Sequence, residues 1–431
     1  MIKKLKNKLI LLVEIVHRRI FGHEMSEKMR EFLKNLSWSF FGGVMAAGIM
    51  FVVNIFAGRF LGPVEYGKYN LILLMSQFFI IPMIFGMDVS VLRKIAKAED
   101  ENETRRLLSG AVFFVGTLTL IVAATVFLNV EFVSNIFSAK SSFVFIAIIF
   151  SIVLTLKTLF DGIIKGLYFF KLQSVIRSIE ALITALIFFV LYIVLKNYLS
   201  LIYSAIVAGL FVSIVYAFKL KHFFEKPDID SIKKLLKYSR FVIASSLVAI
   251  IMGYGDRFVV NKYFGTEELG IYSAYYAATI LVAGQFISII TNVFFAMVAK
   301  IEEKNILLKK IDRMLVIGMI PITAAIFIGG FIILKLFGNA YKSDILILIL
   351  FSVIAALQFF VSFYANIVNV HSEKTYFWGL LLFFVRTLFY VIYILILIKL
   401  NVVSVLAILI GMIINYIVDI FNLRYIIKKY A

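Results

Sequence analysis

Two short stretches, RFLGPVEYGKY at residues 59–69 and KYFGTEELGIY at residues 262–272, decide the fold. They lie 203 residues apart, and at that offset four pairs of residues are identical: Gly62 and Gly265, Glu65 and Glu268, Gly67 and Gly270, Tyr69 and Tyr272. Each stretch follows an apolar segment, and glycine permits the positive φ of a tight turn. A glutamate can also cap the next helix. The chain is therefore predicted to consist of two halves with a hairpin at the same place in each.

The composition is that of a helical membrane protein. The 431 residues are 62% hydrophobic and 16% charged, whereas soluble domains average about 45–50% apolar and 25% charged residues. Soluble and disordered proteins are thereby excluded. The apolar runs are about twenty residues long, which excludes the ten-residue alternation of an outer-membrane barrel. The absence of cysteine excludes disulfides, Cys-based zinc or iron–sulfur sites and thiol catalysis.

Apolar stretches bounded by charge predict an all-α protein with twelve membrane spans. The spans are expected at 36–57, 68–90, 107–128, 142–164, 174–195, 199–220, 240–262, 271–297, 314–335, 343–369, 375–398 and 402–423. Six spans separate the two copies of the repeat, so both halves have the same orientation and form a parallel repeat. We expect an N-terminal six-helix lobe at 36–220, a cytoplasmic linker at 221–237 and a C-terminal six-helix lobe at 238–431.

Lysine and arginine orient the spans. With a cytoplasmic N-terminus, 33 of the 44 basic residues lie inside and only 8 lie in outside loops. Because basic residues collect on the cytoplasmic side, both termini are expected there. The net charge of +19 has the same origin, so nucleic acid is not an expected partner.

Residues 1–35 are predicted to be a basic segment that binds the surface of the membrane. Apolar residues recur at helical spacing: Ile2, Leu5, Leu9, Leu12, Val16 and Ile20. Lysines and arginines lie largely off that stripe, as in helices that lie on an anionic leaflet. No small-residue cleavage site follows, so the segment is not a signal peptide. Membrane lipids are its expected partners.

Three motifs in order, GRFLGPVEYGKY (58–69), FGMDVSVLRKIA (85–96) and GDRFVVNKYFGTEELGIY (255–272), resemble the O-antigen and teichoic-acid flippases. These belong to the MOP superfamily of multidrug, oligosaccharidyl-lipid and polysaccharide exporters, which also holds the MATE transporters. The resemblance implies a MATE-like fold in the cell membrane, two lobes facing a central cavity, and translocation of lipid-linked oligosaccharides by alternating access. It also implies pathway glycosyltransferases as partners. Structural roles are expected for the motif residues Gly62, Pro63, Gly67, Arg93, Gly265, Gly270 and Tyr272.

Charged residues inside predicted spans are candidates for lining a cavity, because an ion at the bilayer centre costs about 2.5–3.5 kcal/mol. Arg386 lies near the middle of the span 375–398. Its guanidinium either binds a substrate phosphate or forms an ion pair between helices. Lys157, Asp161 and Lys165 are spaced by four and share a helix face. They form either an internal Lys–Asp pair or a cationic strip that guides a diphosphate.

Asp256 and Arg257 lie toward the outer end of the seventh predicted span. Asp256 either titrates and couples transport to H⁺ or Na⁺, or makes a structural bond; no other cofactor is expected. Asp161 is a second candidate for ion coupling. Arg257 and Lys165 are further candidate phosphate ligands. The leading hypothesis is that Arg386 and Lys157 hold the diphosphate of the lipid, one from each half.

Four amides near mid-span, Asn54, Gln77, Gln285 and Gln358, either bridge helices or line a cavity that receives sugar. The four histidines form no cluster in the sequence, so no metal site is expected. No Gly-rich phosphate loop with Lys-Ser/Thr is present, which argues against direct use of ATP. The chain is not expected to be an enzyme, and no catalytic residue is assigned.

Two alternative functions remain. An ion-coupled exporter of small molecules from the same superfamily needs carboxylates in its cavity, whereas a diphosphate flippase needs Lys and Arg. A membrane glycosyltransferase or polymerase needs an exterior loop that holds acid and base groups. The exterior loops are short, and Glu65, Glu131 and Glu268 are scattered among them.

Overall fold

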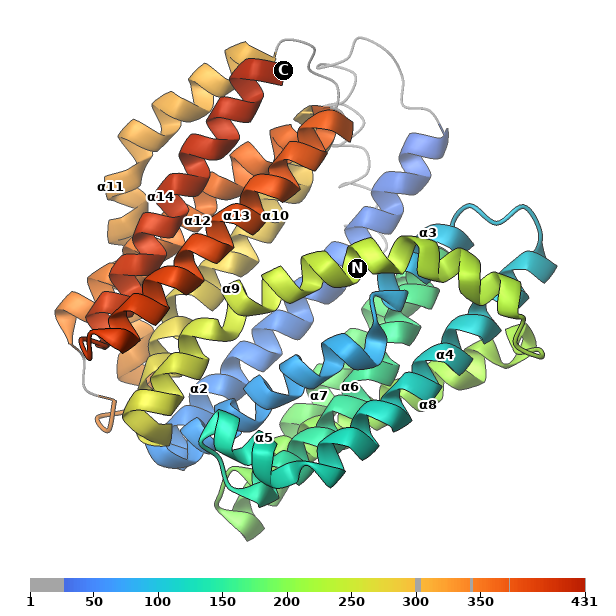
Figure 1. Ribbon diagram of the computed structural model, residues 1–431, viewed down its shortest axis with the longest axis horizontal. Helices are drawn as coiled ribbons and strands as arrows, with labels where there is room; N and C mark the ends of the chain where they lie inside the picture. The colour runs from blue at the N-terminus through green and yellow to red at the C-terminus, as the bar shows by residue number, and fades with distance from the viewer. Residues whose placement is uncertain (1–26, 299–303, 342–343, 372, 431) are drawn as a thin grey trace, which may run out of the picture.

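The computed structural model describes residues 27–298, 304–341, 344–371 and 373–430, and every regular element in these ranges is helical (Figure 1). Residues 1–26 of the predicted surface segment 1–35 lie outside these ranges. The helices are α2 (Glu27–Ile84), α3 (Met87–Ile95), α4 (Glu101–Leu128), α5 (Val130–Phe137), α6 (Ser141–Gly166), α7 (Phe170–Leu195), α8 (Leu199–Leu220), η1 (Lys221–Phe223), α9 (Ile229–Tyr276), η2 (Ala277–Leu281), α10 (Val282–Val298), α11 (Lys304–Phe337), α12 (Ile345–His371), α13 (Glu373–Lys399) and α14 (Val405–Tyr430).

Ten helical stretches in the described part of the chain are long and apolar enough to cross a membrane. Two of them, Gly42–Ile84 with 43 residues and Ile229–Ser288 with 60 residues, far exceed the length that one crossing needs. Each contains a glycine with non-helical dihedral angles, Gly62 at φ 72° and Gly265 at φ 85°, where two helices join at a kink. The predicted positive φ is therefore confirmed for the first glycine of each repeat.

The helices form two groups on either side of α2 and α9. Figure 1 shows α3 to α8 on one side and α10 to α14 on the other, with α2 and α9 between them. α2 and α9 pack extensively against each other. The largest apolar cluster joins both sides and includes Ala57, Leu71, Val260 and Phe351, each at most 1% exposed.

Much of the expected linker 221–237 is helical. η1 takes up Lys221–Phe223 and α9 begins at Ile229, so only residues 224–228 are without helical structure. Asp228 caps α9. The Ser231 hydroxyl, together with the amides of Ser231 and Asp230, donates to its carboxylate and lowers the pKa of Asp228.

The second glycine of each repeat has a different role from the first. A Cβ on Gly67 would overlap the carbonyl oxygen of Thr266, and a Cβ on Gly270 would overlap that of Pro63. Pro63 and Thr266 are themselves matched at the 203-residue offset, so the two repeats pack against each other reciprocally. The expectation that all the repeat glycines serve positive φ was wrong for Gly67 and Gly270, whose hydrogens permit backbone contact.

The predicted capping role of Glu65 is also wrong. Its carboxylate forms an ion pair with Lys68 and accepts from the backbone N–H of Tyr198 at 3.0 Å. Glu65 thus ties the first hairpin to the connection between α7 and α8 instead of the start of its own following helix.

We expect Gly67→Ala and Gly270→Ala each to lower the free energy of unfolding by about 1–3 kcal/mol, the usual cost of overpacking. Neither overlap can be relieved by rotating a side chain, because both partners are backbone atoms. Gly48→Ala on α2 is the matched control, since its Cβ would meet nothing within 4 Å. Thermal unfolding in detergent measures the difference. Equal midpoints for all three variants would contradict the close crossing.

Candidate functional site

Arg257 on α9 is a buried cation without an ion pair in the described part of the chain. The side chain is 8% exposed, and its Nε and Nη2 atoms have no hydrogen-bond partner in the ranges that the structure describes. The guanidinium carbon lies 3.7 Å from the ring centroid of Tyr276 and 5.0 Å from that of Tyr254. Aromatic faces stabilise a cation but leave its N–H groups free to donate. Arg257 is therefore poised to donate to an acceptor that the described residues do not supply.

Asp256 lies beside this arginine and is only partly satisfied. The Tyr272 hydroxyl donates to its Oδ2 at 2.7 Å, while Oδ1 is buried and has no hydrogen-bond partner among the described residues. The side chain is 3% exposed. The motif residue Tyr272 thus positions one of the two carboxylate oxygens.

Tyrosines surround this pair from both α2 and α9. Tyr66 and Tyr69 of α2 stack with ring centroids 6.2 Å apart, and both are buried. With Tyr254, Tyr272 and Tyr276 they form what we call the tyrosine cluster. The cluster lies where α2 and α9 pack. Side chains from both halves of the sequence therefore surround the guanidinium of Arg257 with aromatic rings and hydroxyls.

A second charged region lines a cavity of about 600 Å³ between α2, α3, α6, α7 and α8, here called the α6–α7 cavity. Its charged residues are three acids and three bases: Asp88, Asp161, Glu180, Lys157, Lys165 and Arg177. Lys157 forms an ion pair with Glu180. Arg177 pairs with Asp161 at 2.9 Å, and the Tyr216 hydroxyl donates to the other oxygen of Asp161 at 3.0 Å.

Of the two interpretations of Lys157 and Asp161, the internal ion pair between them is wrong, because both residues find partners on α7. Neighbours one turn apart on a helix gain only about 0.2–0.5 kcal/mol, so a facing helix with opposite charges outcompetes them. The sequence alone did not point to Arg177 and Glu180. Their spacing of three complements the spacing of four between Lys157 and Asp161, and that complementarity was the available signal.

Lys165 differs from the other two bases of the cavity. Among the residues that the structure describes, Lys165 has no carboxylate within 4.0 Å, and Asp88 on α3 has no Lys, Arg or His nitrogen within that distance. These two residues are the cavity charges without a direct ion pair.

Arg386 forms an ion pair between helices, as one of the two interpretations of this residue required. It is 4% exposed and pairs with Asp419 of α14, while Asn415 donates to its backbone oxygen at 3.4 Å. The sequence alone did not point to Asp419, although a carboxylate inside a predicted span is a signal for such a partner. The charge of Arg386 is thus neutralised within its own half of the chain.

The four candidate amides do not form one group. Asn54 donates to the Met50 oxygen at 2.9 Å and accepts from Tyr66 at 3.4 Å, which places it beside the tyrosine cluster. Gln77 and Gln358 are half-buried, and Gln285 is exposed on α10. The motif residue Arg93 lies 4.6 Å from the ring of Tyr238 and links α3 to α9. No group of three or more metal-binding side chains occurs among the described residues.

The profile of the family described as "Polysaccharide biosynthesis protein" matches residues 32–302, which include both repeats, the α6–α7 cavity and Arg257. The chain belongs to this family. A relative from Shigella flexneri, described as "Putative O-antigen transporter", is 24% identical over 72% of this chain and 78% of its own. The "Capsular polysaccharide biosynthesis protein CapF" of Staphylococcus aureus is 24% identical over 74% of this chain and 81% of its own.

Solved structures place this polysaccharide biosynthesis protein among proteins with the MATE fold. A crystal structure of a variant of the Vibrio cholerae MATE transporter VcmN has a TM-score of 0.61 at 12% identity, covering 92% of this chain and 95% of that one. A MOP superfamily transporter from Pyrococcus furiosus has a TM-score of 0.56 at 14% identity, covering 92% and 96%. The chain is thus a multi-pass membrane protein with a MATE-like fold, as its motifs implied.

Proposed function

We propose that this protein moves a lipid-diphosphate-linked oligosaccharide from the cytoplasmic to the outer leaflet by alternating access. The observation that carries the proposal is Arg257, a buried cation with unused donors among the tyrosines of α2 and α9. Guanidinium matches phosphate oxygens in a bidentate fork, and aromatic rings offer faces for sugars to stack on. The two relatives are described as an O-antigen transporter and a capsular polysaccharide biosynthesis protein, which supports this class of substrate.

The architecture that we propose has twelve crossings in two six-helix lobes. The kinks at Gly62 and Gly265 divide each of the two long helical stretches into two spans, which raises ten stretches to twelve crossings. The reciprocal contact of Gly67 and Gly270 is the contact expected near a twofold axis along the membrane normal. Both hairpins then face outward and both termini face the cytoplasm.

Labelling of single cysteines tests this topology, because the natural chain has no cysteine. Lys226 and Lys140 are both exposed and lie at opposite ends of the spans in the proposed topology. We expect an impermeant thiol reagent added outside intact cells to label Lys140→Cys and to leave Lys226→Cys unlabelled. The reverse pattern would overturn the orientation.

Transport coupled to H⁺ or Na⁺ is the expected driving mechanism. Asp256 is the proposed coupling residue, because it directly precedes Arg257, the cation that would hold the substrate, and its Oδ1 has no hydrogen-bond partner among the described residues. Binding of a proton or a metal ion there changes the net charge next to Arg257. Such a change biases a two-state equilibrium only if the two states differ in their contacts with the ion.

An exporter of cationic small molecules is the second candidate. The observation that favours it is the α6–α7 cavity, in which Asp88 has no ion-pair partner among the described residues. Three basic residues in the same cavity oppose a cation, and two of them are paired with carboxylates.

Ligand-dependent unfolding separates the two candidates. A ligand at 100 times its Kd stabilises the folded protein by about 2.7 kcal/mol. We expect a polyprenyl diphosphate to raise the thermal midpoint of the purified protein, and ethidium to leave it unchanged. Polyprenol without phosphate is the matched control for the lipid chain. A shift with ethidium alone would favour the small-molecule exporter.

A further inference from the structure

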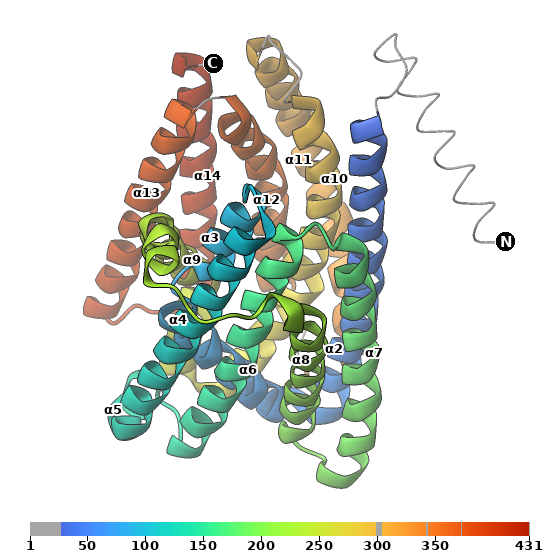
Figure 2. The same ribbon diagram turned by 90° about the vertical axis from the view of Figure 1, so that its right-hand side faces the viewer.

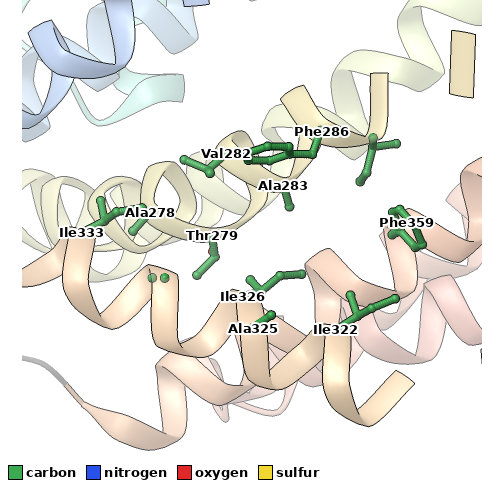
Figure 3. A pocket seen from close by; sticks show the side chains of 13 residues that line it. Ala278, Thr279, Val282, Ala283, Phe286, Ile322, Ala325, Ile326, Ile333 and Phe359 are labelled. Carbon is green, nitrogen blue, oxygen red and sulfur yellow. The ribbon is translucent and has the colours of Figure 1, made fainter. Parts of the chain in front are cut away.

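A second cavity, of about 320 Å³, lies between η2 and α10 on one side and α11 on the other (Figure 3). We call it the α10–α11 groove. Its walls are apolar side chains such as Val282, Phe286 and Ile326. The one side-chain hydroxyl, that of Thr279, already donates to the Tyr275 oxygen at 2.7 Å. The described residues that line the groove therefore offer no free polar side chain to a ligand.

Small residues create this hollow. Ala278, Ala283 and Ala325 line it together with Gly329, and a Cβ on Gly329 would meet nothing within 4 Å. Its wall also contains the π-helical segment η2 (Ala277–Leu281), and π-helical turns are frequent at functional sites.

The size and lining of the groove indicate a single hydrocarbon chain. Sugars and phosphates lose their hydrogen bonds in apolar surroundings, and water does not order there. An apolar cavity of about 150 Å³ holds a benzene-sized ligand, so the α10–α11 groove has room for about a dozen carbons. That is enough for a stretch of one chain, and too little for the paired chains of a phospholipid.

The groove adjoins the candidate phosphate site. Tyr276, whose ring covers Arg257 at 3.7 Å, immediately precedes η2, and Ala278 and Thr279 of η2 line the groove. Residues in a helix rise by about 1.5 Å each, so the tyrosine that covers Arg257 and the first residues of the α10–α11 groove lie within about one helical turn of each other. Figure 2 shows α10 and α11 beside α2, which supplies the other side of the tyrosine cluster.

We propose that the α10–α11 groove binds the hydrocarbon chain of a single-chain lipid whose phosphate is held by Arg257. The assignment of the phosphate rests on the proposed function; the assignment of the chain rests on the groove itself. The groove would hold the part of the chain next to the phosphate and fix the lipid while its glycan occupies the space between the two groups of helices.

Photocrosslinking in nanodiscs tests the proposal. The probe is a polyprenyl phosphate with a diazirine in the first isoprene units, and labelled peptides are identified by mass spectrometry. We expect labels on η2, α10 and the 322–333 part of α11. Unlabelled polyprenyl phosphate should remove them, and phosphatidylglycerol at the same concentration should not. Equal competition by phosphatidylglycerol would show an ordinary bilayer lipid in the groove and overturn the proposal.

Filling the groove supplies the matched variants. Gly329→Leu should reduce labelling of these peptides at least tenfold, whereas Gly116→Leu on α4, where a Cβ also meets nothing within 4 Å, should not change it. Ala325→Leu repeats the test if Gly329→Leu unfolds. Undiminished labelling in a folded groove-filling variant would contradict the proposal.

A neutral polyprenol probe separates the two assignments. It should label the groove in wild type and in Arg257→Gln alike, because the chain site needs no charge. If polyprenol labels the groove while the phosphate group adds nothing to binding, the chain site stands and the phosphate site of the proposed function fails. If neither probe labels the groove, the chain site fails whatever Arg257 binds.

Discussion

Replacing Arg257 with glutamine is expected to reduce lipid translocation at least tenfold and to leave the protein folded. A hydrogen bond to a charged group contributes about 1.5–3 kcal/mol, which corresponds to a factor of about ten to one hundred and fifty. The protein should still fold because Arg257 has no ion pair in the described part of the chain. Its removal therefore leaves no carboxylate without an ion-pair partner there. Initial rates in proteoliposomes and thermal midpoints should be measured on the same preparations.

Two further variants make this result specific. Arg257→Lys keeps the charge but loses the planar fork, so it should restore only part of the rate. Arg240→Gln removes an exposed arginine from the same helix and should leave the rate unchanged. Full activity in a well-folded Arg257→Gln protein would remove Arg257 from the substrate site.

Arg386→Gln is expected to have the largest effect on stability, a loss of about 3–5 kcal/mol in the free energy of unfolding. The change leaves Asp419 buried without its cation, since both side chains lie inside the packing of α13 and α14. The double variant Arg386→Gln with Asp419→Asn should recover most of the loss, because it leaves no unpaired charge. Thermal unfolding in detergent measures both.

The same pair of variants decides between the two interpretations of Arg386. Loss of stability that the double variant repairs, with normal activity per folded molecule, would confirm a structural ion pair. A stable Arg386→Gln protein that cannot translocate lipid would instead support the hypothesis that Arg386 and Lys157 hold the diphosphate.

The repeat is the part of the fold that the sequence predicts best, because turn glycines act locally. Gly62 and Gly265 have the positive φ that their position after an apolar segment suggested. The meeting of Gly67 with Gly270 was also accessible in principle. Matched residues near a twofold axis contact each other, so a glycine conserved between the halves can be a contact point instead of a turn.

The surroundings of Arg257 follow from the same hairpin. Tyr254 lies eleven residues before Gly265 and Tyr276 lies eleven residues after it, so the turn brings both level with each other and beside Arg257. Counting outward from a glycine hairpin therefore predicts which side chains meet across it.

Pairing between helices is where prediction from the sequence failed. Spacing shows that Lys157 and Asp161 share a face, but the rotation and register of α6 against α7 decide that Glu180 and Arg177 are their partners. The same holds for Asp419, which reaches Arg386 only because α14 packs on α13. A hydrophobic pattern records which helix faces are buried, and it contains no information on which charges will face each other.

The central claim is that this chain carries a lipid-diphosphate-linked glycan across a bilayer. The most direct measurement is the movement of such a lipid, with a fluorescent glycan, across liposomes that contain the purified protein, read by quenching from an impermeant reagent. The account predicts movement that depends on the protein and is at least tenfold slower in Arg257→Gln. A lipid that carries the same fluorescent glycan without the diphosphate should not move. Movement no faster than in empty liposomes, by a folded protein under imposed H⁺ and Na⁺ gradients, would contradict it.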